Sequence, residues 1–324
     1  MTPRPPPRPA PPPSCSAGGA GGDYDPAGVG IRDAATVLIL DERPDLHVLM
    51  LQRNSASVFA GDMWVFPGGA VDVADASPEA DATVAGLTDA EASRRLGLDA
   101  GGIAFWVAAL RETFEEAGIL LAHRAGRAAG PDAAGRAAGP DDGIIDLSPP
   151  AVSERFSRYR AEVNAGTRDF VATVSGENLR LDGNDVHFVA RWITPLGPPR
   201  RYDTRFFVTA MPPGQRPLHD NDEAVSNRWV RAADARALSA GGELVMMTPT
   251  VGMLTRLATF GSVAEATAAA AAGTPADDEV VRIRFGNDGP DRIAFPSHPD
   301  YDDADDRSET GMLRWPAGSA AERV

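Results

Sequence analysis

The sequence predicts an α/β fold in which a mixed β-sheet lies between helices on both faces. Short apolar runs of strand length alternate with segments of helical length and composition. Their order lacks the regular strand–helix–strand rhythm of a doubly wound parallel sheet, which favours a mixed sheet instead. With 324 residues, 43% of them hydrophobic, the chain is long enough to bury a substantial core.

The first expected elements form a β-hairpin. Residues 34–40 and 46–51 are apolar runs of strand length, and the turn between them contains Pro44. A further short strand at residues 64–66 stops at the Pro-Gly-Gly of residues 67–69, a sequence that favours a tight loop.

The longest expected helix spans residues 103–117. It has helical length and composition, and it is followed by Gly118, a residue type that is common just after a helix C-terminus. Further strands are expected at residues 119–122, 186–193, 205–210 and 227–230, and further helices at residues 150–163 and 248–260.

Composition divides the chain into three parts. Residues 1–30 are rich in proline and then in glycine, which predicts a disordered tail. Residues 31–265 form the expected domain, with insertions near 76–102 and 124–148. The second insertion contains a tandem nine-residue repeat, AGRAAGPDA followed by AGRAAGPDD, and two copies are too few for a solenoid. Residues 266–324 are alanine-rich and then acidic, which predicts a partly disordered extension.

The chain is acidic, with 46 Asp and Glu against 31 Lys and Arg, and its formal net charge is −15. This balance argues against a general nucleic-acid binder, which needs basic surface to displace counterions. The single cysteine, Cys15, excludes an intrachain disulfide and a Cys-based zinc site. No apolar stretch is long enough for a membrane span and no signal peptide is apparent, so we expect a cytoplasmic protein without a membrane partner.

The most informative segment is Arg-Glu-Thr-Phe-Glu-Glu-Ala-Gly-Ile at residues 111–119. Glu112, Glu115 and Glu116 are spaced i, i+3 and i+4, which places their carboxylates on one face of the expected helix. Such carboxylates repel one another, and Mg²⁺ or Mn²⁺ would neutralise them because these ions take carboxylate oxygens. An isolated cluster of this kind is more often a solvated charged face. Five fixed residue types, however, occur together by chance at roughly one site in a million.

This string resembles the second half of the signature of the Nudix hydrolases, G-x5-E-x7-R-E-U-x-E-E-x-G-U, in which U is a bulky apolar residue. The Phe-Pro-Gly-Gly of residues 66–69 looks like the loop that enters the signature. With Gly69 as the first glycine, Asp75 takes the first glutamate position, and Arg111 comes about 28 residues later than the pattern requires. A rival register from Gly97 has regular spacing but places an isoleucine at the glutamate position. We prefer Gly69 because a loop insertion is tolerated thermodynamically.

An interrupted signature is similar to that of one Nudix subgroup, the acyl-coenzyme A diphosphatases. The resemblance spans about residues 31–260. Segments outside the signature that look like this subgroup lie at residues 49–53, 61, 66–72, 191–195, 201–207 and 222–229.

The resemblance implies an α/β/α sandwich and a metal site. Glu115 and Glu116 are expected to bind Mg²⁺ or Mn²⁺, with Glu112 as a further ligand or as the catalytic base. The carbonyl of Gly69, or of Gly68, would complete the metal site, and Gly68 is also a candidate for contact with substrate. The ions would polarise a diphosphate and activate the water that attacks phosphorus.

Other candidates come from the same resemblance. Arg111 is expected to orient Glu112. Glu223 is the candidate for a late carboxylate that binds a further metal ion or activates water, and it is equally well interpreted as an exposed loop acid. Arg53 and Arg205 are candidates to bind substrate phosphates, although arginines at strand ends more often form surface ion pairs.

The resulting expectation is an enzyme that hydrolyses coenzyme A or acyl-coenzyme A to 3′,5′-ADP and (acyl-)phosphopantetheine. A second interpretation keeps this chemistry and changes the substrate to ADP-ribose, a dinucleotide or a nucleotide sugar. A third is a non-catalytic Nudix-fold binding module, which normally lacks some signature carboxylates, whereas all three helix glutamates are present here. The expected partner is a small nucleotide, with no nucleic acid and no membrane, and a homodimer is compatible with the sequence.

Overall fold

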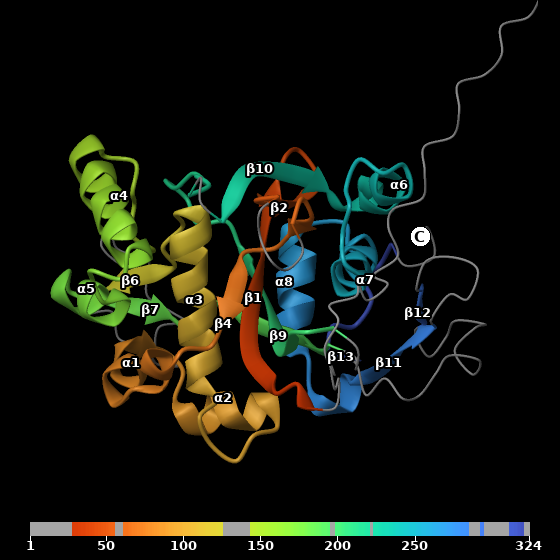
Figure 1. Ribbon diagram of the computed structural model, residues 1–324, viewed down its shortest axis with the longest axis horizontal. Helices are drawn as coiled ribbons and strands as arrows, with labels where there is room; N and C mark the ends of the chain where they lie inside the picture. Colours follow the sequence, from red (N-terminus) through yellow and green to blue (C-terminus); the bar gives the residue numbers. More distant parts are fainter. Residues whose placement is uncertain are drawn as a thin grey trace, which may run out of the picture.

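The computed structural model describes residues 28–55, 61–125, 143–194, 198–220, 223–284, 292–294 and 311–320. Nearly all of the expected N-terminal tail and of the nine-residue repeat lies outside the described residues. In Figure 1, helix α3 (Ile103–Ala117) covers one face of the central strands, and α7 (Thr248–Leu257) and α8 (Val263–Ala272) lie on the opposite side. The architecture is thus an α/β/α sandwich, which confirms the predicted fold class.

The main sheet has ten strands in the described part of the chain, and it is mixed. β1 and β9 run parallel, whereas the other pairs of this sheet are antiparallel. Its strands, in spatial order, are β10 (Ala224–Arg231), β2 (Leu46–Arg53), β1 (Ile31–Glu42), β9 (Arg201–Ala210), β8 (His187–Ile193), β13 (Gly311–Leu313), β11 (Glu279–Arg284) and β12 (Arg292–Ala294), with β3 (Trp64–Val65) paired to β2 and β4 (Gly68–Ala70) paired to β1.

A smaller sheet and several short helices lie beyond α3 (Figure 1). The small sheet has the order β5 (Val84–Ala85), β7 (Leu179–Asp182) and β6 (Ala122–Arg124). None of the helices in the described residues is long and apolar enough to cross a membrane. The remaining helices are α1 (Pro78–Thr83), α2 (Asp89–Leu96), α4 (Pro150–Asn164), α5 (Phe170–Gly176) and α6 (Ala235–Ala240), with 3₁₀ turns η2 (Val73–Ala76), η4 (Ala232–Asp234) and η5 (Pro275–Asp277).

Burial on both faces explains the continuous apolar sequence of β1. Val37 and Ile39 pack against the α3 side, and Leu38 and Leu40 pack against the α7 and α8 side. A strand covered by helices on both faces has no polar side to alternate with. Trp106 of α3 is fully buried in the first of these layers.

Most elements lie where the sequence predicts them. The expected hairpin is β1 and β2, which pair antiparallel. The helix expected at residues 103–117 is α3, and Gly118 follows it with a left-handed φ of 68°. The helix expected at residues 150–163 is α4.

The strand predicted at residues 119–122 is wrong, because pairing begins only at Ala122 in β6. Residues 119–121 are buried, but Leu120 makes both backbone hydrogen bonds with the side chain of Gln215. The Leu120 N–H donates to Oε1 at 2.9 Å, and Nε2 donates to the Leu120 carbonyl at 2.8 Å. A glutamine amide thus takes the place of a neighbouring strand, so the apolar run signalled burial and not pairing.

The chain after residue 310 contributes to the core. β13 pairs with β8 in the main sheet, and Trp315 is fully buried. The Trp315 indole N–H donates to the carbonyl of Ala266 at 2.9 Å, and its ring lies 5.0 Å from that of Phe260. These contacts tie the segment to α8, so the layer on that side of the sheet depends on it.

Candidate active site

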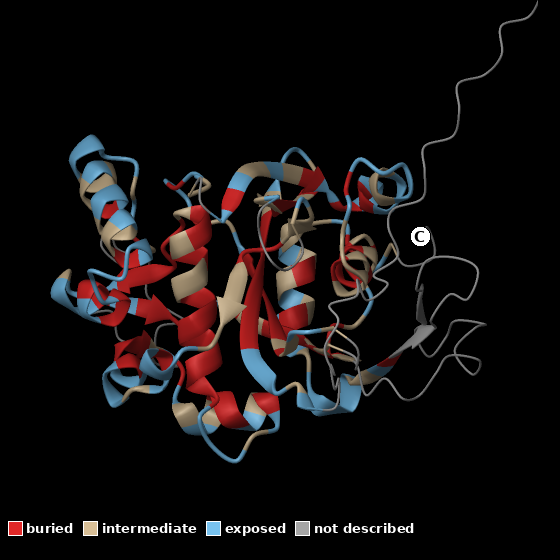
Figure 2. Cartoon of the chain, viewed as in Figure 1, coloured by how far each residue is buried: buried red, intermediate tan, exposed pale blue. Residues whose placement is uncertain are grey.

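The carboxylates of Glu112, Glu115 and Glu116 lie in the last turns of α3. The preceding turns of this helix are buried throughout, and they hold it against the sheet (Figure 2). Glu116 is 5% exposed, and the side chains of Glu112 and Glu115 are 14% and 21% exposed. The three acids are therefore withdrawn from water, and the interpretation as a solvated charged face does not apply.

The glycine loop that precedes η2 closes over these carboxylates. The Gly68 N–H donates to Glu116 Oε2 at 2.9 Å. Thr36 of β1 anchors the loop, because its Oγ1 donates to the Pro67 carbonyl at 2.7 Å. Strands β1 and β4 of the main sheet thus hold the Gly68 N–H against the buried carboxylate of Glu116.

Steric contact explains the two adjacent glycines. A Cβ at Gly69 would lie 2.4 Å from Glu112 Oε1, and a Cβ at Gly68 would lie 2.4 Å from the carbonyl oxygen of Ala35. Both distances are shorter than any van der Waals contact. The loop can approach the acidic helix this closely only without side chains.

Arg111 neutralises one side of the cluster. Its Nε and Nη2 donate to the two oxygens of Asp75, each at 2.9 Å, and its Nη1 donates to Glu112 at 2.8 Å and to Glu115 at 3.3 Å. Burial alone would lower the pKa of Arg111, but the hydrogen bond to Asp75 and the surrounding carboxylate charges raise it above its ordinary value. Arg111 therefore contacts Glu112, the residue that it is expected to orient, and it also contacts Glu115.

The position of Asp75 supports the register that starts at Gly69. Asp75 is 1% exposed and provides the main ion pair of Arg111. In the rival register the first glycine, Gly97, is the C-cap of α2, and Ile103 is the buried first residue of α3. Neither contacts the acidic cluster, so the insertion lies between Asp75 and Arg111.

Burial and mutual repulsion raise the pKa values of the carboxylates. Burial, together with the nearby charges of Glu115 and Glu223, raises the pKa of Glu112 to about 7 even though Arg111 opposes the shift. Burial and the charge of Glu112 raise the pKa of Glu116 well above its ordinary value, against the Gly68 N–H and Arg53. Two carboxylates that resist ionisation side by side are in an environment that favours a bound cation.

Glu223 and Arg53 form the opposite wall of the site. Arg53 ends β2 and Glu223 directly precedes β10, and Nη2 of Arg53 lies 3.5 Å from Glu223 Oε2. Glu223 is 63% exposed at its side chain, and its charge acts on both Glu112 and Glu116. Within the described residues the buried Nε of Arg53 has no hydrogen-bond partner. The structure thus brings Arg53 and Glu223 close to the carboxylates of Glu112 and Glu116.

Arg205 is not brought to this site. It is 2% exposed, its guanidinium stacks on Phe105 at 4.7 Å, and it pairs with Asp203. Phe105 belongs to the first turn of α3, whereas the acidic cluster occupies the last turns. The prediction that Arg205 binds a substrate phosphate is corrected accordingly, because a guanidinium enclosed by its own strand and helix is inaccessible to a ligand.

A residue that the sequence did not single out reaches the site from α4. Nε of Arg160 donates to the Glu115 carbonyl at 2.8 Å, and Nη2 donates to the Glu116 carbonyl at 2.9 Å. Nothing in the local sequence distinguishes Arg160 from Arg155 and Arg158 on the same helix. Only the docking of α4 against the end of α3 does so.

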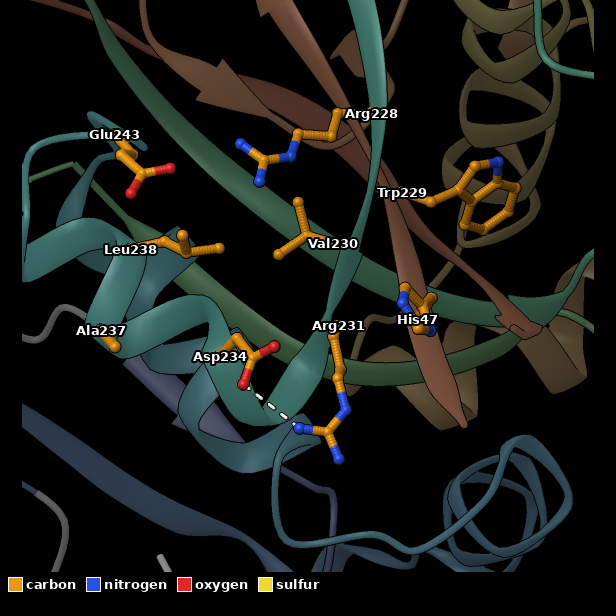
Figure 3. Close-up of a pocket in the computed structure, with 9 residues that line it drawn as sticks. All are labelled: His47, Arg228, Trp229, Val230, Arg231, Asp234, Ala237, Leu238 and Glu243. Carbon is orange, nitrogen blue, oxygen red and sulfur yellow. Dashed lines mark hydrogen bonds and ion pairs between the residues drawn. The ribbon is translucent and has the colours of Figure 1, made fainter. Parts of the chain in front are cut away.

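A larger hollow than the one beside the acidic cluster lies elsewhere. It measures about 490 Å³ and opens beside β10 and α6 (Figure 3). Arg231 and Asp234, three residues apart in its wall, form an ion pair at 3.2 Å. A smaller hollow of about 220 Å³ adjoins the Arg111 network and includes Asp75 and Glu115 in its wall. We place the candidate active site at the carboxylates with raised pKa values and not at the larger hollow.

The donor set at the end of α3 suits a hard divalent cation. Two buried carboxylates of raised pKa face a third acid, Glu223, and carboxylate oxygen is the ligand that Mg²⁺ and Mn²⁺ take. As the described side chains stand, no group of three or more acidic, histidine or cysteine residues could hold a metal ion. Glu115 and one oxygen of Glu112 are paired with Arg111.

Comparison with known proteins identifies a family that matches this chain. Residues 27–257 match a family model described as the NUDT19 Nudix domain. The acyl-coenzyme A diphosphatase NUDT19 of Gallus gallus is 29% identical over 278 residues, which cover 71% of this chain and 69% of that protein. The Homo sapiens protein of the same name is 29% identical and covers 68% of this chain, while the match spans 62% of its own length.

A solved structure shares the fold. A NUDIX hydrolase from Alicyclobacillus acidocaldarius superimposes with a TM-score of 0.57 at 26% identity. The match covers 76% of this chain and all of that one.

Proposed function

This chain belongs to the Nudix hydrolases, and from that premise we propose that it hydrolyses the diphosphate of coenzyme A or acyl-coenzyme A in a reaction that depends on Mg²⁺ or Mn²⁺. The products would be 3′,5′-ADP and (acyl-)phosphopantetheine. The names of the NUDT19 relatives from Gallus gallus and Homo sapiens support this substrate. The chain spans about two thirds of the length of those relatives, so the activity of the whole proteins is extended to it only as a proposal.

One observation carries the chemical part of the proposal. Glu112 and Glu116 are buried together beneath the Gly68–Gly69 loop, and the pKa of each is raised by burial and by neighbouring negative charge. The repulsion within such a pair is relieved either by protonation or by a compensating positive charge such as a bound cation. A cation that binds there would also meet the negative phosphates of a substrate.

The roles of the individual residues follow from their positions. Glu116 and Glu112 would hold the metal, with Glu115 and the Gly69 carbonyl as further ligands. When bound, the metal supplies charge stabilisation for the diphosphate and lowers the pKa of water. Glu223 would accept a proton from the attacking water.

Two arginines would act beside these carboxylates. Arg53, whose side chain is 23% exposed, would bind a phosphate oxygen through its terminal nitrogens, and Arg111 keeps Glu112 in place. In the reaction a water oxygen bonds to one phosphorus, the bridging P–O bond breaks, and the leaving phosphate keeps the electron pair.

A substrate screen tests the proposal. The chain would be incubated with Mg²⁺ or Mn²⁺ and with coenzyme A, acyl-coenzyme A, ADP-ribose, a dinucleotide or a nucleotide sugar, and phosphate release would be followed through a coupled nucleotidase. We expect turnover of the coenzyme A compounds. Fast cleavage of ADP-ribose without turnover of coenzyme A esters would instead establish the second substrate class. Binding without any turnover would establish a non-catalytic module.

A cytoplasmic location and a homodimer are further proposals. They are compatible with the absence of a membrane-spanning helix from the described residues, and fractionation and light scattering measure them directly.

A further inference from the structure

The end of α3 depends on hydrogen-bond donors from outside the helix. The last carbonyl groups of any α-helix lack partners within it. Here the carbonyls of Glu115 and Glu116 accept from Arg160, and the carbonyl of Ala117 accepts from the Leu218 N–H at 2.8 Å. The three last residues of the helix are thus fastened by other segments.

Arg160 spans two consecutive carbonyls with one planar group. Its Nε reaches Glu115 at 2.8 Å and its Nη2 reaches Glu116 at 2.9 Å, so the guanidinium bridges both in a fixed geometry. The approach is possible because residue 118 is glycine, whose added Cβ would lie only 3.0 Å from Nη1 of Arg160. Nδ2 of Asn164, one turn further along α4, adds a contact to the Glu115 carbonyl at 3.3 Å.

The helix that carries Arg160 is otherwise loosely attached. Most of α4 is exposed or half-buried (Figure 2), and its buried residues are Phe156 and Val163. Its other arginines point to different partners, since Arg155 pairs with Glu177 and Arg158 lies near Glu162. Arg160 therefore makes the shorter hydrogen bonds from α4 to α3, beside the longer contact from Asn164.

The two residues whose carbonyls Arg160 bridges, Glu115 and Glu116, also contribute carboxylates to the candidate site. The side chain of a residue leaves the backbone at the Cα next to its carbonyl, so fixing the peptide fixes the direction of the Cα–Cβ bond from which the carboxylate extends. We propose that Arg160 is a positioning residue that holds the last turn of α3 and thereby sets where the Glu115 and Glu116 carboxylates point. This inference rests on the proposed metal-dependent function.

If Arg160 acted only through its charge, replacing it would have the opposite effect on metal binding from a positioning role. A guanidinium beside an acidic cluster repels a metal ion, so its removal would tighten metal binding if charge alone mattered. If positioning matters, loss of the two hydrogen bonds from the planar guanidinium weakens metal binding even when the positive charge remains. Arg160→Lys keeps the positive charge and loses the pair of hydrogen bonds, whereas Arg160→Gln loses both.

The first measurement is hydrogen–deuterium exchange of peptides that cover residues 113–119, in the full chain without metal. We expect exchange in this turn to accelerate at least about fivefold in Arg160→Lys and in Arg160→Gln, since its amides open more often once the carbonyls are released. Arg158→Lys and Arg158→Gln are matched controls on the same helix and should leave it unchanged. Unchanged exchange in the folded Arg160 variants would overturn the proposal.

The second measurement is Mn²⁺ binding by electron paramagnetic resonance in the absence of substrate. We expect Kd for Mn²⁺ to rise about 10-fold in Arg160→Lys, a typical effect of losing a group that orients metal ligands. Wild-type affinity in the folded lysine variant, or tighter binding in Arg160→Gln, would overturn the positioning role. If the glutamine variant fails to fold, the lysine variant decides alone.

The outcomes separate the two proposals. A wild-type chain that binds Mn²⁺ without cleaving coenzyme A esters refutes the proposed substrate and leaves the role of Arg160 standing on the binding data. A wild-type chain that binds no Mn²⁺ overturns both.

Discussion

Arg111 and Asp75 form a two-pronged ion pair between residues that are 36 positions apart, with both contacts at 2.9 Å. The pair joins the two halves of a signature that the intervening helices α1 and α2 interrupt. Asp75 is 1% exposed and the side chain of Arg111 is 11% exposed, so the two charges depend on each other. The interruption lengthens the chain between the halves and leaves their contact in place.

Asp75→Ala should therefore destabilise the fold strongly. It leaves a buried guanidinium without its main partner, and breaking a buried ion pair costs about 3–5 kcal/mol of unfolding free energy. Asp72→Ala is the control, because Asp72 contacts the same guanidinium at 3.5 Å but is 66% exposed. Urea unfolding should show a change below about 1 kcal/mol for the control. Equal losses in the two variants would contradict the role assigned to Asp75.

Glu116→Gln should separate activity from stability. Glutamine retains an oxygen to accept the Gly68 N–H but removes a charge from a buried, repulsive pair, so we expect turnover to fall at least about 100-fold. The melting temperature without metal should stay the same or rise, because the raised pKa of Glu116 shows that its charged form is disfavoured in the fold. Glu154→Gln, on the exposed face of α4, should alter neither quantity. Retained activity in Glu116→Gln would refute the metal-site assignment.

Gly69→Ala should impair the site through steric contact. The new Cβ would lie 2.4 Å from Glu112 Oε1, which forces the loop or the carboxylate to move. We expect kcat to fall roughly 100-fold, as displacements of about 1 Å at catalytic groups do. Gly176→Ala is a matched control, since no atom lies within 4 Å of its added Cβ. Steady-state kinetics on both variants measure the difference, and equal rates would argue against a close-packed loop.

Protonation of Glu112 should shape the pH dependence. Its pKa is about 7 in the fold against 4.5 in the unfolded chain, so between these values the folded state holds more protons than the unfolded state. Stability without metal should therefore fall as pH rises through this window. Activity should rise over the same range, because metal binding needs the carboxylate. Glu115 and Glu116 also have raised pKa values and add to this slope, so melting temperatures at several pH values are compared between the wild type and Glu112→Gln. The slope should be shallower in the variant, and an equally steep slope would exclude Glu112 as a source.

Trp315→Ala should destabilise the far side of the sheet. The indole is fully buried against Phe260 and donates to Ala266, so its removal should cost about 3–5 kcal/mol. Val280→Ala, whose side chain is 57% exposed, is the control. Denaturant unfolding monitored by circular dichroism tests the pair. A small effect at Trp315 would mean that the core does not depend on this segment.

The sequence predicted the acidic helix and its glycine loop because both are encoded locally. The i, i+3, i+4 spacing places three glutamates on one face of any helix, and adjacent glycines mark a close approach of backbone. The alignment of the chain with the interrupted signature could also be predicted, since Asp75 keeps its spacing from Gly69. Each of these signals lies within a few residues of the atoms it describes.

The remaining features depend on segments that meet only after folding. Gln215 replaces a strand partner for Leu120 across 95 residues, which no local pattern announces. Arg160 differs from other arginines of its helix only in what that helix docks against. Arg205 carried the pattern of a ligand-binding arginine, but its burial against Phe105 is set by how α3 crosses β9.

The pairing of β8 with β13 has a consequence for how the protein is made. β8 is complete at residue 193, and its partner strand begins only at residue 311. At about 5–20 residues per second, a ribosome needs roughly 6 to 24 seconds to deliver that partner. During this interval the nascent chain carries an open, apolar sheet edge of the kind that recruits other strands. Final assembly of the sheet is thus a late event in biosynthesis, and the newly made chain is most exposed to aggregation and to chaperone capture just before it.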